Sequence, residues 1–151
     1  NDRLFCYHAS LEEFTEEIGD KYELIISNPP FYSEDYKSNN SKRDLARFTD
    51  AMPFNHLLFN VNKLLSENGM FCVIIPFKEE TNFIALAKNF NLYLNSVLRV
   101  KGNPTSQFKR SLLTFSYEET VLEQDILIIE TSRHQFTEKY INLTKEFYLK
   151  M

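Results

Sequence analysis

Residues 22–31 read Tyr-Glu-Leu-Ile-Ile-Ser-Asn-Pro-Pro-Phe, and this stretch carries the clearest structural signal in the chain. Its first six residues form a near-continuous apolar run, the pattern of a strand buried on both faces of a parallel sheet. The two prolines then end the strand, because proline cannot continue a hydrogen-bonded ladder. The stretch therefore predicts an α/β protein in which Asn28 and the prolines lie at the carboxyl end of a strand.

The segments around this stretch alternate between strand and helix patterns. Apolar side chains at spacings of three and four predict helices over residues 53–65 and 79–90, and the segment 137–150 is also amphipathic. Further strands are predicted from short apolar runs at residues 4–8, 70–77, 92–101, 111–117 and 125–130. This order predicts a Rossmann-like, mostly parallel sheet with helices on both faces and an antiparallel hairpin near the C-terminus, at one edge.

Length and composition limit the classes of function that the chain can have. With 151 residues, 43% of them apolar and 25% charged, it suits one globular domain. A net charge of −4 gives no global electrostatic case for nucleic-acid binding, although local basic patches remain compatible with it. The three glycines, Gly19, Gly69 and Gly102, stand alone, so the chain contains no P-loop and no G-x-G-x-x-G turn.

Membrane, metal and disulfide chemistry have no sequence support. The apolar runs are too short to span a bilayer, and residues 1–3 show no signal peptide, so we expect a cytoplasmic protein without a membrane partner. Three histidines without C-x-x-C or H-E-x-x-H motifs predict no metal site, and we expect the histidines to be structural or on the surface. Cys6 and Cys72 lie in apolar runs and are expected to be buried and reduced.

The motif Asn28-Pro29-Pro30-Phe31 is the main candidate for chemistry, since ligands of open α/β sheets bind beyond the carboxyl ends of the strands. A planar amine is a poor nucleophile because its lone pair is delocalised. The Asn28 side-chain oxygen and the Pro29 carbonyl can accept its two N–H groups, and the prolines fix the carbonyl direction. Phe31 offers a face for stacking an extruded base, a contact of about 1–3 kcal/mol. The alternative is that Pro-Pro merely ends a strand.

A strand ending in this motif resembles the amino-methyltransferases of the class I, S-adenosylmethionine-dependent fold. Within them the chain is most similar to the bacterial tRNA(Val) adenine-N6 methyltransferases. The similarity includes Arg43-Asp44-Leu45-Ala46-Arg47, residues 101–106, and the tail 137–151. It implies methyl transfer from S-adenosyl-L-methionine to the N6 amine of an adenine in tRNA, with adenine 37 of tRNA(Val) as the expected target. Asn28, Pro29, Pro30 and Phe31 would be the catalytic residues.

The resemblance also implies binding roles. Ser10, Leu11 and Asn28 would contact the cofactor, although Ser10 is equally explained as a helix N-cap, which we favour. Contacts to the tRNA partner would come from Tyr32 beside the base and from basic side chains near phosphates, and the expected set is Tyr32, Lys42, Arg43, Arg47, Lys109 and Arg110. Lys37, Arg99 and Lys101 extend these basic clusters, for which solvated loop charge is the alternative. The aromatic stripe of the tail is expected to pack in the core.

The chain departs from the family pattern in one respect. Family members begin with a further portion that carries a glycine-rich cofactor loop, and nothing in this sequence matches it. We therefore expect residues 1–151 to be the C-terminal part of a single methyltransferase domain, lacking its N-terminal strands and inactive alone. The sheet edge left open can support self-association. The alternatives are methylation of a glutamine side-chain amide or of DNA adenine, or a truncated, non-catalytic RNA-binding module.

Overall fold

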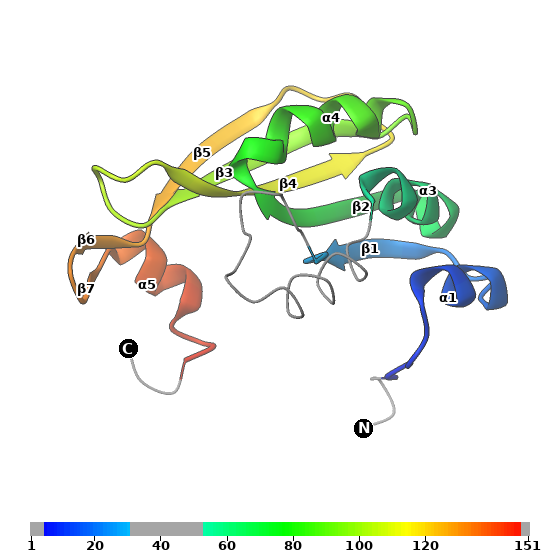
Figure 1. Ribbon diagram of the computed structural model, residues 1–151, viewed down its shortest axis with the longest axis horizontal. Helices are drawn as coiled ribbons and strands as arrows, with labels where there is room; N and C mark the ends of the chain where they lie inside the picture. Colours follow the sequence, from blue (N-terminus) through cyan, green and yellow to red (C-terminus); the bar gives the residue numbers. More distant parts are fainter. Residues whose placement is uncertain (1–4, 31–52, 149–151) are drawn as a thin grey trace, which may run out of the picture.

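The computed structural model describes residues 5–30 and 53–148. Its central element is a five-stranded sheet in the order β1-β2-β4-β3-β5 (Figure 1). The strands are β1 (Tyr22–Ser27), β2 (Leu65–Pro76), β3 (Tyr93–Lys101), β4 (Phe108–Ser116) and β5 (Glu123–Ile128). β1 pairs in parallel with β2, and β3 with β5, whereas β4 is antiparallel to both of its neighbours. Four strands thus share one direction, as the mostly parallel prediction requires.

The helices agree with the periodicity in the sequence, with shifts at the ends. They are α1 (Leu11–Glu17), α3 (Phe54–Leu64), α4 (Glu80–Lys88) and α5 (Glu138–Thr144), with a 3₁₀ turn η2 (Phe77–Glu79) before α4. A small second sheet joins β6 (Glu130–Ser132) to β7 (Gln135–Phe136). Residues 5–8 form no strand, contrary to the prediction, and α5 is shorter than the amphipathic segment that contains it.

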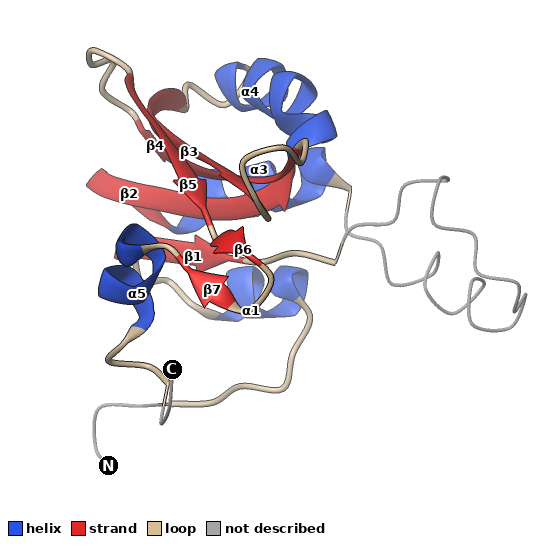
Figure 2. Ribbon diagram, turned by 90° about the vertical axis from the view of Figure 1, so that its left-hand side faces the viewer, coloured by secondary structure: helices blue, strands red, loops and turns tan. Residues whose placement is uncertain are grey.

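The hydrophobic core lies between α3, α4 and one face of the sheet (Figure 2). Alternation along β2 directs Phe71, Val73 and Ile75 to this face. There Phe71 meets Phe83 of α4 and Phe115 of β4, with ring centroids 6.4 Å and 6.1 Å away. This packing holds β2 in the middle of the molecule, and so fixes where its carboxyl end lies.

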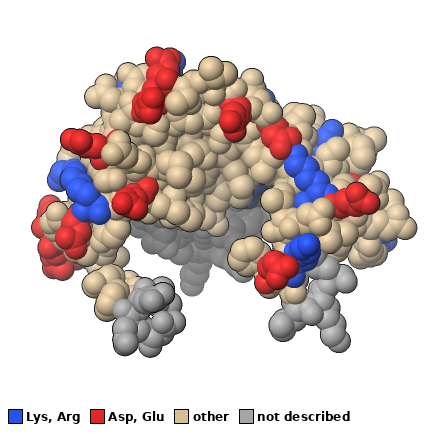
Figure 3. Space-filling view, turned by 180° about the vertical axis from the view of Figure 1, so that it is seen from behind, with Lys and Arg blue, Asp and Glu red and all other residues tan. Residues whose placement is uncertain are grey.

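The opposite face of the sheet is uncovered by the described helices. Leu24 is 50% exposed, Ile26 74% and Met70 50%. Figure 3, which views this side, shows a broad uncharged centre with charged side chains toward its margins. The predictions that residues 22–27 are buried on both faces, and that helices cover both faces, are therefore wrong for the described residues. β1 is an edge strand of the described sheet, and α3 and α4 pack on the other side.

The antiparallel hairpin is present as β3 and β4, but its place in the sheet differs from the prediction. β4 lies between β2 and β3, and β5 takes the edge beside β3. Burial explains this order, because β4 buries Ser111, Leu113 and Phe115, whereas the first four residues of β5 are exposed. The more apolar strand gains more from a central position.

Candidate active site

The strand-end motif lies where an open α/β sheet binds its ligands. Ser27, the last residue of β1, pairs with Val73 in the middle of β2, and the chain then leaves the sheet through Asn28-Pro29-Pro30. Pro29 is buried, whereas Asn28 is exposed and its amide has no partner among residues 5–30 and 53–148. The motif thus presents an exposed amide, unpaired within the described residues, beside a backbone segment whose φ angles the prolines fix.

Several of the predicted residues lie outside the described ranges. These are Phe31 of the motif and, in the loop that follows, Tyr32, Lys37, Lys42, Arg43 and Arg47. Their assignments as base-stacking and RNA-binding residues stay predictions.

Ser10 is the N-cap of α1. Its Oγ accepts a hydrogen bond from the Glu13 backbone N–H at 3.2 Å, and Glu13 Oε2 accepts one from the Ser10 N–H at 2.8 Å. This reciprocal pair is a capping box, so the prediction of a cap is confirmed. The Ser10 backbone N–H and hydroxyl lower the pKa of Glu13. The neighbouring Leu11 is half-buried against the core, and cofactor contacts by either residue stay predictions.

Replacing Ser10 with alanine is expected to lower the free energy of unfolding by about 0.5–2 kcal/mol, since one helix N–H loses its partner. Ser10→Asp keeps an acceptor oxygen and is the matched control, expected to stay near the starting stability. Urea titration followed by circular dichroism measures both values. Equal stability of the alanine variant and the parent would contradict the capping role.

Two of the predicted basic residues lie at the same end of the sheet as the motif, where the parallel strands β1 and β2 end. Lys109 and Arg110 follow Phe108 at the beginning of β4, and both are exposed. Arg110 pairs with Pro76, the last residue of β2, so the start of β4 adjoins the carboxyl end of β2. Lys109 and Arg110 therefore lie at the same end of the sheet as the candidate site, and their contact with RNA phosphates stays a prediction.

Arg99 takes no part in that basic edge. Its guanidinium donates three hydrogen bonds of 2.6–3.0 Å to the carboxylate of Glu80, and a fourth to Gln124. Glu80 is buried and also accepts a 2.5 Å bond from the hydroxyl of Ser111. The interpretation of Arg99 as a phosphate contact is therefore replaced by an internal ion pair that ties α4 to β3, β4 and β5.

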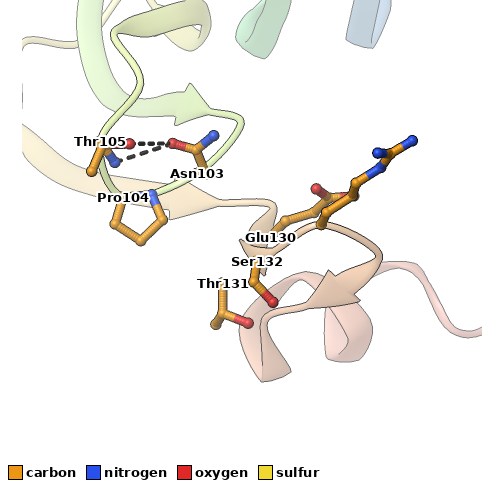
Figure 4. Close-up of a pocket in the computed structure, with 7 residues that line it drawn as sticks. Asn103, Pro104, Thr105, Glu130, Thr131 and Ser132 are labelled. Atoms are coloured by element: carbon orange, nitrogen blue, oxygen red, sulfur yellow. Dashed lines mark hydrogen bonds between the residues drawn. The ribbon is translucent and has the colours of Figure 1, made fainter.

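Lys101 and the turn after it are likewise ordered by local bonds. Lys101 Nζ donates to the Pro104 carbonyl at 2.8 Å. Asn103 Oδ1 accepts bonds from both the backbone N–H and the hydroxyl of Thr105 (Figure 4). It also accepts a bond from the Ser106 N–H. A hollow of about 430 Å³ separates this turn from residues 130–133. The side-chain-to-backbone bonds hold the turn in one shape at the end of β3.

The structure also tests the sequence predictions for the cysteines, for His56 and for the C-terminal tail. Cys6 and Cys72 are free thiols, but Cys6 is exposed and Cys72 is half-buried, so the prediction that both are buried is wrong. The His56 Nε2 contacts the Glu12 carboxylate, which places this histidine on the surface between α1 and α3. The tail does not pack in the core, because α5 has no buried residue and Phe147 is 86% exposed.

Two features are absent from the described ranges, a cluster of metal-ligand side chains and a long apolar helix. Nowhere in residues 5–30 and 53–148 do three or more His, Cys, Asp or Glu side chains gather as a metal site would require. In the same ranges, no helix combines the length and the apolar character needed to cross a bilayer.

Sequence reasoning missed an aromatic pair at this edge. Phe77, directly after β2, and Phe108, the first residue of β4, lie with their ring centroids 5.1 Å apart. A signal was present in the sequence, because each phenylalanine is followed by basic residues, Lys78 in one case and Lys109-Arg110 in the other. Only the antiparallel pairing of β2 with β4 brings the two segments together.

Solved structures share the fold of this chain. A predicted O-methyltransferase from Agrobacterium tumefaciens matches 92% of the chain and 58% of its own length, with a TM-score of 0.62 and 16% identity. The M1.HpyAVI–SAM complex matches 87% of the chain and 60% of its own, with a TM-score of 0.51 and 10% identity. At these identities the likeness establishes a methyltransferase fold and nothing about substrate.

The sequence relatives are much closer. No protein-family model matches the chain. Proteins named tRNA1(Val) (adenine(37)-N6)-methyltransferase from Flavobacterium psychrophilum and Flavobacterium johnsoniae are 61% and 62% identical over 151 residues, and one from Christiangramia forsetii is 49% identical. The chain spans 64% of the length of both Flavobacterium proteins. Over its whole length the chain is thus similar to a part of proteins that carry the name tRNA1(Val) (adenine(37)-N6)-methyltransferase.

Proposed function

We propose that the complete protein transfers a methyl group from S-adenosyl-L-methionine to the N6 amine of adenine 37 in tRNA(Val). The observation that carries this proposal is the exposed Asn28 amide beside buried Pro29, at the carboxyl end of a parallel strand, in a chain 61% identical to relatives of that name. A tRNA substrate also implies a cytoplasmic location, and residues 1–151 would form the C-terminal part of one methyltransferase domain.

The motif residues would act by positioning the amine. When bound, the cofactor supplies a methyl group on a positively charged sulfur, which is already strongly electrophilic. The Asn28 side-chain oxygen and the Pro29 carbonyl would accept the two N–H groups of the adenine amine and aim its lone pair at that methyl. Phe31 would stack on the base. Orientation and preorganised acceptors would thus provide the catalysis, without a general base of shifted pKa.

The described residues fit one part of a cofactor site. Asn28 offers an exposed amide at the motif, and Ser10, Leu11 and Asn28 are the residues proposed to contact the cofactor. The three isolated glycines supply no glycine-rich loop, so most of the cofactor's contacts would come from a portion of the protein outside these 151 residues. For this reason we propose that residues 1–151 are inactive by themselves.

The test is a methyl-transfer assay on the complete protein with radiolabelled S-adenosyl-L-methionine. Unmodified tRNA(Val), duplex DNA and a glutamine-bearing protein are offered side by side. We expect label in tRNA(Val), recovered as N6-methyladenosine after digestion, and none in a tRNA(Val) transcript with guanine at position 37. Label in DNA or in the protein substrate, with tRNA unlabelled, would refute the proposal.

A further inference from the structure

The geometry points to a second base-binding site at this edge of the sheet. We propose that Phe77 and Phe108 stack on an unpaired nucleotide of the RNA substrate, near the adenine that is methylated. This inference rests on the proposed function and adds to it a contact outside the strand-end motif.

The aromatic pair is only partly buried, whereas the aromatic side chains of the core are fully buried. Phe77 is 37% exposed and Phe108 is half-buried, whereas Phe71, Phe83 and Phe115 of the core are fully buried. The Phe77 and Phe108 rings are tilted by 47° to each other, with centroids 5.1 Å apart. Fully burying an exposed phenylalanine side chain contributes about 1.5–3 kcal/mol, so two rings left partly in water leave part of that gain to a ligand.

The surroundings of the pair are positively charged. A cavity of about 420 Å³ adjoins the two rings, a size within the range of small-ligand sites. The described residues that line it are three cations and no acid, together with uncharged groups: Pro76, Phe77, Lys78, Gln107, Phe108, Lys109 and Arg110. Lys101 Nζ lies 5.8 Å from the centre of the Phe108 ring. In a chain of net charge −4, this is a local concentration of positive charge.

Aromatic rings among cations match a ligand that combines planar rings with negative charge. An unpaired nucleotide has both, because its base can stack on a ring while its phosphates meet Lys109 and Arg110. A phosphopeptide would satisfy the cations without stacking on both rings. The observations therefore favour single-stranded RNA.

Phe77 and Phe108 also lie close to the strand-end motif, as binding of the same RNA strand requires. Ser27 of β1 pairs with Val73 of β2, and Pro76, three residues further along β2, pairs with Arg110 of β4. Neighbouring strands lie about 5 Å apart, so the start of β4 is two strand spacings from the path of β1. An RNA strand whose adenine reaches Asn28 would pass directly over this edge.

The experiment measures binding of a fluorescent RNA hairpin, carrying the anticodon loop of tRNA(Val), to the complete protein. The double variant Phe77→Ala/Phe108→Ala is expected to raise Kd by about 5- to 150-fold, the equivalent of losing one stacked base. Phe77→Tyr/Phe108→Tyr keeps both rings and should bind like the parent. Phe59→Ala is the matched control, because Phe59 is 47% exposed on α3 and also lies under a cation, with Lys63 Nζ 4.6 Å from its ring centre.

Salt dependence separates stacking from charge. The aromatic variant is expected to leave the slope of log Kd against log salt unchanged. Lys109→Ala and Arg110→Ala should each reduce that slope by about 0.7, the value for one lost phosphate contact to a single strand. A parent-like Kd for the double alanine variant, with the parent binding RNA, would overturn the inference and leave the proposed function standing.

A second measurement needs no variant and so does not depend on folding. Iodouridine is placed in turn at each loop position flanking adenine 37, and the hairpin is irradiated in complex with the parent protein. We expect a cross-link to the peptide that contains Phe77 or Phe108 from at least one position. Cross-links that avoid both peptides overturn the inference, and stronger displacement of the RNA by a phosphopeptide than by unlabelled hairpin does so too.

Discussion

Replacing Asn28 with alanine in the complete protein is expected to lower kcat for methyl transfer by about 10²- to 10³-fold. The reason is that one of two preorganised acceptors for the adenine amine is lost, and single groups of this kind typically carry such a factor. Cofactor affinity is expected to change little, since the electrophile is held mainly by other contacts. Single-turnover kinetics measures the first quantity and isothermal titration with S-adenosyl-L-methionine the second.

Two further variants of the complete protein serve as controls for Asn28→Ala. Asn28→Asp keeps an acceptor oxygen at the same position and should retain more activity than the alanine variant. Asn89→Ala changes an exposed asparagine at the C-cap of α4, a helix that begins beside the carboxyl end of β2 and runs away from it, and should leave kcat as it is in the parent. Unchanged turnover of the Asn28→Ala variant would contradict the proposed mechanism, whatever the identity of the methyl acceptor.

Replacing Arg99 with alanine is expected to lower the free energy of unfolding by about 3–5 kcal/mol at neutral pH. The change leaves the Glu80 carboxylate buried, with only the Ser111 hydroxyl as a partner, and an uncompensated buried charge is costly. Glu80→Ala should cost less, about 1–3 kcal/mol, because the Arg99 side chain is 29% exposed and can regain water. Denaturant unfolding measures both variants.

The double variant Glu80→Ala/Arg99→Ala completes the cycle. Removing both charges leaves no buried ion, so its loss of stability should be smaller than the sum of the two single losses. Additive losses would mean that the two side chains contribute independently, and would contradict the ion-pair interpretation.

Acid should weaken the same interaction. Burial by itself raises the pKa of Glu80, but the hydrogen bonds from Arg99 and Ser111 outweigh it, and the pKa lies below its ordinary value of 4.5. A lowered pKa in the folded state stabilises the protein above pH 4.5, and this contribution is lost as pH falls through the folded-state value. Stability curves against pH should show that loss in the parent and lack it in Glu80→Gln.

The sequence by itself determined the local elements and the place of the motif. Apolar side chains at spacings of three and four give α3 and α4 an apolar stripe each. This stripe can be recognised without knowing what the helix packs against. Ser10 and Glu13 stand three residues apart, so the capping box forms wherever α1 forms. Asn28 and the prolines follow an apolar run, and the prolines end the strand in any fold.

Only the tertiary structure decided the order of the strands in the sheet and the interaction partners of the charged side chains. Nothing local places β4 between β2 and β3, because that order depends on how much each strand buries against helices distant in sequence. In the folded sheet Arg99 lies against Glu80. A side chain that the sequence predicts to contact phosphate therefore forms an internal ion pair. The pairing of β2 with β4 also brings Phe77 to Phe108. The spacing of apolar residues indicates the secondary structure of one segment. Which segments contact each other depends instead on the free energy of packing them together.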